Sequence, residues 1–150
     1  MRISPNCRLF RSQAGFTLIE IMVVVVILGI LASIVVPRLI GREEQAKRTS
    51  SAVQIKNFEE ALSLFKLDNG FYPDTEQGLQ ALVSPPTNGR EARNWREGGY
   101  LKKVPKDPWG NAYIYLSPGL HDPYDIISYG NDGVAGGEGE NADVESWSIE

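Results

Sequence analysis

The sequence of 150 residues contains only one histidine, His121, and one cysteine, Cys7. This leaves few side chains for nucleophilic catalysis or for a hydrolytic metal centre, because both depend on such residues. The G-x-x-x-x-G-K-[ST] pattern that cradles nucleotide phosphates does not occur either. The composition therefore argues against an enzyme and against a protein that binds ATP.

Positive charge is missing from the C-terminal part of the chain. No Lys or Arg follows Lys106, whereas nine acidic residues do: Asp107, Asp122, Asp125, Asp132, Glu138, Glu140, Asp143, Glu145 and Glu150. Residues 1–15 have the opposite bias, with three arginines and no acid. An acidic region repels phosphates, which argues against nucleic-acid binding. The polarity agrees with a basic end held in the cytoplasm and a domain exported from it.

Residues 16–36 form an apolar run, FTLIEIMVVVVILGILASIVV, in which Glu20 is the only charged residue. A helix of this length spans roughly 30 Å, the thickness of a bilayer's hydrocarbon core. The run predicts a transmembrane helix, with the basic N-terminus in the cytoplasm.

An ordinary secretory signal also combines a basic end with an apolar core. Here the run is too long, and Ala32-Ser33 precedes Ile-Val-Val-Pro rather than a small-x-small cleavage site. Small residues stand instead before the run, at Ala14-Gly15. We therefore favour cleavage between Gly15 and Phe16, with an uncleaved signal anchor as the alternative.

Glu20 places a carboxylate inside an apolar segment, which costs on the order of 2.5 kcal/mol or more in lipid. Cleavage after Gly15 would create a positive α-amino group on Phe16, four residues from Glu20. In a stack of helices, the amine of one subunit can neutralise the carboxylate of the next and set the axial register. The alternative is a carboxylate that reaches the interface or is protonated.

The segment Ala-Gly-Phe-Thr-Leu-Ile-Glu, after a basic leader and before an apolar run, resembles the N-terminal signal of type IV pilins and pseudopilins. This resemblance implies cleavage after Gly15 by a prepilin peptidase, N-methylation of Phe16, and a role for Glu20 in assembly. Cys7 lies in the leader, so the mature chain would contain no cysteine and no disulfide.

From Arg38 to about Asp68 the pattern becomes amphipathic. Apolar residues follow helical spacing at Ile55, Phe58, Ala61, Leu62, Leu64 and Phe65. The spacing predicts the second half of a long helix, which ends near Asn69-Gly70 and packs against a small sheet. Pro37 would loosen this helix, because proline lacks the N–H.

Turns dominate residues 70–108, where we expect one short helix at Leu79–Val83 with Thr75 as its cap. Three side chains in this region are expected to cover the core: Trp95, Tyr100 and Leu101. Three strand-like segments follow: Ala112–Leu116, Tyr124–Tyr129 and Glu145–Ile149. Pro/Gly-rich turns separate them, which predicts an antiparallel meander.

Four further motifs narrow the resemblance to the major pseudopilins of the type II secretion system, the general secretion pathway protein G family. They are Tyr72-Pro73, Thr75-Glu-Gln-Gly-Leu79, Asp107-Pro-Trp-Gly-Asn111, and Tyr124-Asp125 with Ser128-Tyr-Gly-Asn-Asp-Gly133. The resemblance implies an α+β, pilin-like fold: a long N-terminal helix, membrane-spanning in its first half, packed on a small antiparallel β-sheet with a C-terminal calcium loop. The implied divisions are a leader at 1–15, a transmembrane and assembly helix at 16–40, and a periplasmic globular domain at 41–150.

The resemblance also implies a non-enzymatic subunit that polymerises into a periplasmic pseudopilus and drives export of folded proteins across the outer membrane. It places the chain in the bacterial inner membrane as a single-pass protein with its C-terminal domain in the periplasm. The implied partners are other copies of the chain, minor pseudopilins, prepilin peptidase, the inner-membrane secretion platform and the outer-membrane secretin. An adhesive or motility type IV pilin is the alternative, disfavoured because such pilins usually carry two C-terminal cysteines.

Residues 131–143, NDGVAGGEGENAD, combine acids, amides and glycines, a composition that suits Ca²⁺. The EF-hand spacing is absent, and the residues alone favour a solvated loop. The resemblance implies calcium instead, bound by Asp132 and Asp143 and by the backbone carbonyls of Tyr129 and Val134. Glu140 is an alternative to Asp143. Calcium would close the C-terminal region in place of a disulfide.

Two other functions compete with a filament subunit. The first is a membrane-anchored periplasmic enzyme that uses His121 with Asp122 or Asp125, although His121 beside Pro118-Gly119 is more typical of a surface turn. The second is a monomeric, membrane-anchored calcium-binding domain.

Overall fold

The computed structural model describes residues 15–149, without the side chains of residues 35–40. The predicted leader lies outside the described residues except for Gly15, and so does the side chain of Pro37. The chain divides into two compact units, with the boundary between Ile40 and Gly41, and each unit is described by itself.

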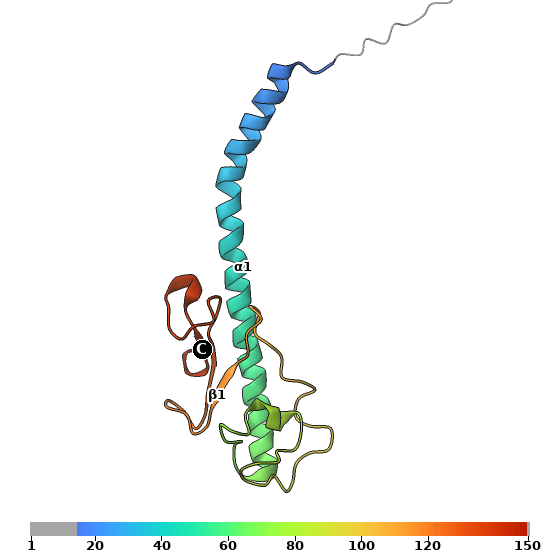
Figure 1. Cartoon of the computed structure of the whole chain (residues 1–150), viewed down its shortest axis with the longest axis vertical. Coiled ribbons are helices and arrows are strands. Elements are labelled where there is room, and N and C mark those ends of the chain that lie inside the picture. The colour runs from blue at the N-terminus through green and yellow to red at the C-terminus, as the bar shows by residue number, and fades with distance from the viewer. Residues whose placement is uncertain (1–14, 150) are drawn as a thin grey trace, which may run out of the picture. The chain divides into compact units, whose positions relative to one another are not determined.

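Helix α1 runs from Leu18 to Asn69 and contributes to both units, as Figure 1 shows. Its predicted end near Asn69-Gly70 is confirmed. Gly70 donates its N–H to the Lys66 carbonyl at 2.7 Å and has a φ of +82°, the left-handed conformation that ends helices and favours glycine.

In the second unit, α1 buries one face against the rest of the chain. Ile55, Phe58, Ala61, Leu62 and Phe65 are all buried, as their spacing predicts. Leu64, by contrast, is 41% exposed, so its assignment to this stripe was wrong. It lies about 200° around the helix from Leu62, because each residue advances the helix by about 100°.

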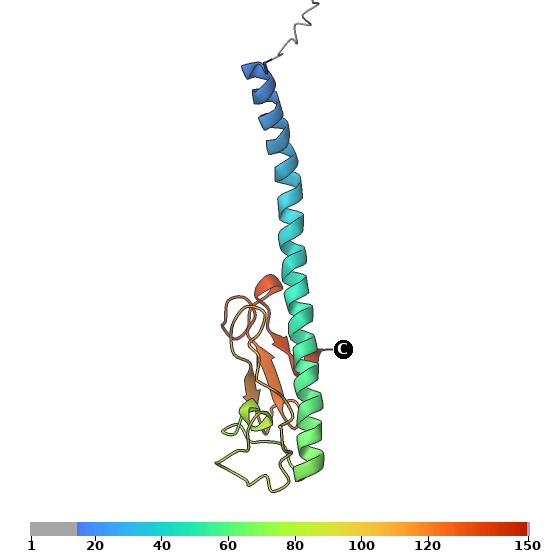
Figure 2. The same ribbon diagram turned by 90° about the vertical axis from the view of Figure 1, so that its right-hand side faces the viewer.

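Three short strands form the predicted antiparallel meander, in the order β1 (Ile114–Leu116), β2 (Asp125–Ser128) and β3 (Val144–Glu145). Ile114 pairs with Ile127, and Ser128 pairs with Val144. The sheet lies beside the C-terminal part of α1 (Figure 2). Tyr113, Tyr115, Ile126 and Val144 join the α1 stripe in one core.

The third strand is shorter than predicted, because residues Ser146–Ser148 form a 3₁₀ turn, η3. The Ser146 hydroxyl accepts the N–H of Ile126 at 3.1 Å. This side-chain hydrogen bond takes the place of a backbone hydrogen bond between β2 and the segment after β3. Ser148 donates its hydroxyl back to the Glu145 carbonyl at 3.0 Å. Serine competes with the backbone for hydrogen bonds in this way, which ends the strand after Glu145.

The region between α1 and β1 is mostly turns, with one 3₁₀ helix, η1, at Leu79–Leu82. The predicted Thr75 cap was wrong, because no side chain caps η1. The Thr75 hydroxyl instead bonds both backbone groups of Ser117, accepting at 2.8 Å and donating at 3.1 Å. Trp95, Tyr100 and Leu101 pack against the core, as predicted.

Candidate functional site

The first candidate site is the start of α1, where Thr17 and Glu20 hydrogen-bond reciprocally. The Glu20 N–H donates to the Thr17 hydroxyl at 3.3 Å, and the Thr17 N–H donates to the Glu20 carboxylate at 3.4 Å. This is a capping box, which satisfies two backbone donors that a helix N-terminus otherwise leaves free. The sequence carries the signature of this box, T-x-x-E, at Thr17–Glu20.

Phe16 stands directly before this box with 79% of its surface exposed, and nothing lies within 4 Å of a Cβ built on Gly15. Both flanks of the predicted cleavage site are therefore accessible. The box holds the Glu20 carboxylate at the N-terminal end of the helix. The N–H group that this carboxylate accepts belongs to Thr17, the residue directly after Phe16.

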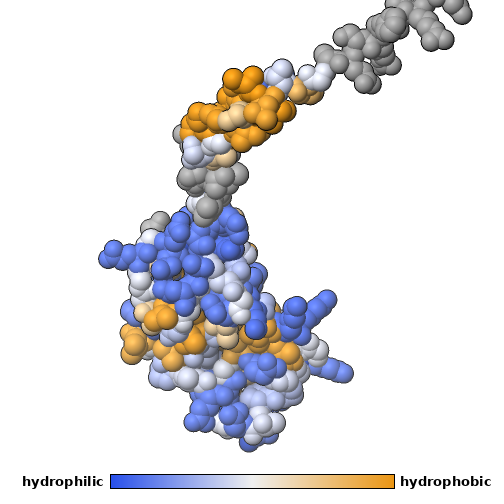
Figure 3. All heavy atoms as spheres, turned by 45° about the horizontal axis from the view of Figure 1, so that its top comes forward, coloured by the Kyte–Doolittle hydropathy of each residue, from blue (hydrophilic) through white to orange (hydrophobic). Residues whose placement is uncertain are grey.

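The segment after the box exposes its apolar side chains (Figure 3). The large ones are between 48% and 79% exposed: Leu18, Ile19, Ile21, Met22, Val23, Val24, Val25, Val26, Ile27, Leu28, Ile30, Leu31 and Ile34. Among residues 15–34 and 41–149, no helix meets the length and apolarity that crossing a membrane requires. A continuous apolar surface of this kind normally marks a site of interaction.

The second candidate site is the acidic loop, residues 129–143, which joins β2 to β3. Ser128 and Val144 pair across the sheet at the two ends of this loop. The limbs approach each other at Gly130, where an added Cβ would stand 3.2 Å from the Ala142 carbonyl oxygen. They approach again at Gly137, where a Cβ would stand 2.5 Å from the Asn141 carbonyl oxygen.

Within the acidic loop, Asp143 has the carboxylate oxygen best suited to hold a cation. Its Oδ2 accepts the N–H of Gly136 at 2.8 Å, but its Oδ1 is buried and has no hydrogen-bond partner among the described residues. A buried polar atom without a partner is costly, so this oxygen is where a cation would be stabilising. The donor set fits a hard ion such as Ca²⁺.

The other predicted ligands lie in the same loop but form no carboxylate cluster. Asp132 accepts the N–H of Val134 at 3.1 Å, and Glu140 lies in a short 3₁₀ turn, η2 (Gly139–Asn141). No three His, Cys, Asp or Glu side chains within the described part of the chain gather closely enough to hold a metal. A cation would therefore depend on backbone carbonyls, such as those of Tyr129 and Val134.

Asp107, the first residue of the Asp107-Pro-Trp-Gly-Asn111 motif, holds the first limb of the acidic loop through hydrogen bonds. It is buried, with 4% of its surface exposed. It accepts the hydroxyl of Ser128 at 2.6 Å and the backbone N–H groups of Trp109 and Asn111 at 3.1 and 2.7 Å. Asn111 in turn donates its amide to the Gly130 carbonyl at 3.0 Å. The D-P-W-G-N motif thus fixes the first limb of the loop.

His121 and Asp125, the pair considered for an enzyme, are in contact. The His121 Nδ1 lies 3.2 Å from Asp125 Oδ2, and the His121 ring stacks on Trp147 at 3.8 Å between centroids. Burial alone would raise the pKa of Asp125, but the backbone N–H groups of Leu120 and Asp122 and the His121 ring lower it overall. Asp125 thus stabilises the turn between β1 and β2 by accepting several of its hydrogen bonds.

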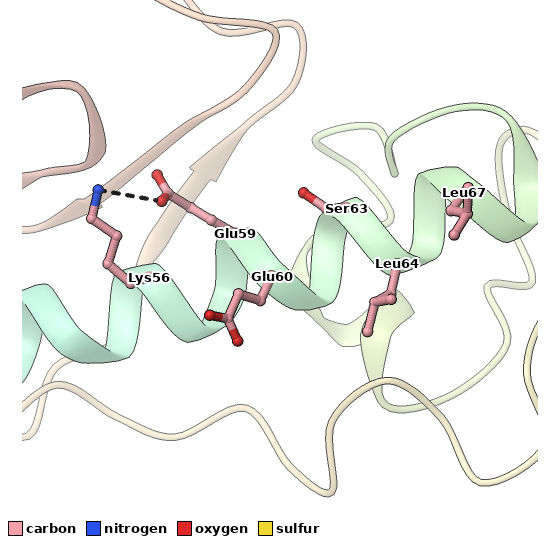
Figure 4. Close-up of a pocket in the computed structure, with 6 residues that line it drawn as sticks. All are labelled: Lys56, Glu59, Glu60, Ser63, Leu64 and Leu67. Carbon is pink, nitrogen blue, oxygen red and sulfur yellow. Dashed lines mark ion pairs between the residues drawn. The ribbon is translucent and has the colours of Figure 1, made fainter.

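A surface groove of about 610 Å³ lies on α1 in the second unit (Figure 4). Leu64 and Leu67 supply its apolar part, and Lys56 pairs with Glu59 at 3.7 Å at its other end. Its residues come from the helix face opposite the buried stripe.

Comparison with known proteins identifies the family. Residues 38–147 match the family described as type II secretion system (T2SS), protein G. The chain belongs to the type II secretion protein G family. It is thus a pseudopilin, a subunit of the pseudopilus in type II secretion. Residues 10–36 match the prokaryotic N-terminal methylation motif, in agreement with the signal predicted around Gly15-Phe16.

Relatives in the protein G family match nearly the whole chain. The type II secretion system core protein G of Vibrio cholerae is 57% identical over 140 residues, covering 93% of this chain and 95% of that protein. That of Pseudomonas aeruginosa is 56% identical over 137 residues, covering 91% and 96%. The crystal structure of the major pseudopilin of enterohaemorrhagic Escherichia coli superimposes with a TM-score of 0.68 at 43% identity, covering 77% of this chain and 98% of that one. The predicted α+β fold, a long N-terminal helix packed on a small antiparallel sheet, is confirmed, and so is the predicted function in type II secretion. The adhesive pilin is set aside.

Proposed function

We propose that the chain inserts into the bacterial inner membrane through residues 16–36, with its N-terminus in the cytoplasm and its globular unit in the periplasm. The length and apolarity of this run support the proposal. So do the exposed apolar side chains along it, which need lipid or neighbouring helices to cover them.

Prepilin peptidase then cuts after Gly15 and Phe16 is N-methylated. The accessible junction and the match to the methylation motif support this step. Mature subunits polymerise through residues 16–40 into a periplasmic pseudopilus, which pushes folded proteins through the outer-membrane secretin. Minor pseudopilins and the inner-membrane secretion platform are the expected partners, and the chain itself performs no catalysis.

The capping box is the observation that carries this proposal furthest. It holds the Glu20 carboxylate against the backbone next to Phe16, where cleavage creates the α-amino group. The two opposite charges then lie at the same end of the helix. In a stack of subunits, the carboxylate of one copy pairs with the amine of the next and sets their register.

The acidic loop binds Ca²⁺ through Asp132 and Asp143, with the carbonyls of Tyr129 and Val134 as further ligands. Glu140 is the alternative to Asp143 as a carboxylate ligand. The Oδ1 of Asp143, which is buried and has no hydrogen-bond partner among residues 15–149, supports the choice of Asp143. When bound, the ion supplies positive charge that joins the two limbs of the loop and closes the C-terminal region.

Filament assembly tests the function directly. Replacing Glu20 with alanine, or Gly15 with lysine, should stop assembly, because the first removes the carboxylate and the second blocks cleavage. Glu43→Ala is the matched control, since Glu43 is an exposed carboxylate on the same helix that pairs with Lys47 at 3.0 Å. Sedimentation of filaments of normal length from either test variant would contradict the proposal.

A further inference from the structure

The acidic loop is held on both limbs by side chains from distant parts of the second unit. Asn111 holds the first limb at Gly130. Arg48, on α1, holds the second limb: its guanidinium donates to the Ala142 carbonyl and, at 3.3 Å, to the Asp143 carbonyl. These bonds join residues more than 90 positions apart in the sequence, which ties the end of the loop to the helix.

The guanidinium of Arg48 is suited to this task by its shape. It is planar and carries donors in a fixed fork, so it can reach two consecutive carbonyl oxygens at once. Within the described residues, Arg48 takes part in no ion pair with a carboxylate. It is half-buried and lines a groove of about 270 Å³ between α1 and the C-terminal segment, together with Asp143 and Val144.

These contacts restrict the orientation of Asp143 from both sides. Its carbonyl is held by Arg48, and the next residue, Val144, is buried in the core and paired with Ser128. Its Oδ2 is fixed by the N–H of Gly136 at 2.8 Å. The direction of the buried Oδ1 therefore follows from the position that Arg48 gives to the main chain.

We propose that Arg48 is a positioning residue for the cation site, which orients Asp143 toward the ion and links occupancy of the loop to α1. This inference rests on the calcium binding proposed above. Because linkage is reciprocal, a bound ion also strengthens the contact between the C-terminal segment and the helix.

Charge and positioning predict opposite effects when Arg48 is removed. A guanidinium near a cation repels it, so charge alone predicts that Arg48→Gln tightens Ca²⁺ binding. Positioning predicts weaker binding, since partners that orient metal ligands typically contribute about tenfold to a hundredfold in affinity. The direction of the change in Kd thus separates the two roles.

The test is isothermal titration of Ca²⁺ into the full chain in detergent, as wild type, Arg48→Gln, Arg48→Lys and Lys47→Gln. Lys47→Gln is the matched control, because it removes the same charge one residue away, from a side chain that pairs with Glu43 on the same helix. We expect Arg48→Gln to raise the Kd at least about tenfold. Arg48→Lys keeps the charge but loses the fork, so it should also raise the Kd, whereas Lys47→Gln should leave it within about twofold.

Other outcomes contradict the proposal in distinguishable ways. An unchanged or lower Kd for Arg48→Gln overturns the positioning role and leaves the calcium site standing. A lower melting temperature in chelator with an unchanged Kd assigns Arg48 a purely structural role. Absence of Ca²⁺ binding by the wild type overturns the calcium site and this inference together. Far-UV circular dichroism in chelator verifies folding, and the lysine variant carries the test if the glutamine variant does not fold.

Discussion

Replacing Asp107 with asparagine should destabilise the second unit although the two side chains have the same shape. The carboxylate accepts three hydrogen bonds, and the shortest, at 2.6 Å, comes from the Ser128 hydroxyl to Oδ2. In asparagine this oxygen becomes an NH₂ group, which cannot accept. The two bonds to Oδ1, from the N–H groups of Trp109 and Asn111, survive without the help of the negative charge.

The size of the effect follows from these bonds. Hydrogen bonds to charged groups contribute about 1.5–3 kcal/mol each, against about 1 kcal/mol for neutral pairs. One charged bond lost, and two reduced to the strength of neutral bonds, give a loss of at least about 2.5 kcal/mol for Asp107→Asn. Asp107→Ala removes all three bonds to the carboxylate and should cost at least about 4.5 kcal/mol.

Urea unfolding of the full chain in detergent and chelator, followed by near-UV circular dichroism, measures this loss. Near-UV circular dichroism reports on aromatic packing in the second unit, where Trp109 lies next to the substituted residue. Asp122→Asn is the control, because Asp122 is exposed and should change stability by less than about 0.5 kcal/mol. If Asp107→Asn is as stable as this control, the claim that Asp107 supports the acidic loop is wrong.

Three further predictions concern the core, the pH dependence and the ion. Phe65→Ala should cost about 3–5 kcal/mol in thermal or urea melts, because Phe65 is fully buried, whereas exposed Leu64→Ala should cost about 1 kcal/mol or less. Burial raises the pKa values of Tyr113 and Tyr115 to about 12, so the unfolded chain loses its phenolic protons first. Stability should therefore be intact below pH 10 and fall between about pH 10 and 12. Ionisation of Tyr113 and Tyr115 near pH 10 in the folded chain would contradict this. Chelation of Ca²⁺ should lower the melting temperature of the wild type but not of Asp143→Asn; equal responses would exclude Asp143 as a ligand.

The helical half of the fold could be predicted from the sequence because its signals are local. The 3.6-residue spacing of apolar side chains located the buried face of α1, and Gly70 marked its end. Leu64 was misplaced because an apolar residue two positions from the stripe looks similar in the sequence but faces the other way.

The sheet and the caps were harder because their determinants are non-local. Thr75 precedes η1 like a cap, yet its hydroxyl bonds Ser117, 42 residues away. Ser146 ended the third strand early by bonding the backbone of Ile126. Side-chain hydrogen bonds of this kind depend on which segments the fold brings together, so no local sequence pattern predicts them.

The candidate sites were predictable to different degrees. Glu20 was found from its position in an apolar run, although its bond to Thr17 was visible as a T-x-x-E signature and went unused. The acidic loop was located from composition. The hydrogen bonds by which Asp107 and Arg48 hold it could be recognised only in the folded chain.

The central claim, that this pseudopilin matures at the Gly15-Phe16 junction, is tested most directly by intact mass and N-terminal sequencing of the protein extracted from membranes. We expect a chain that begins at N-methylated Phe16. A chain that begins at Met1, or after Ser33, would contradict it.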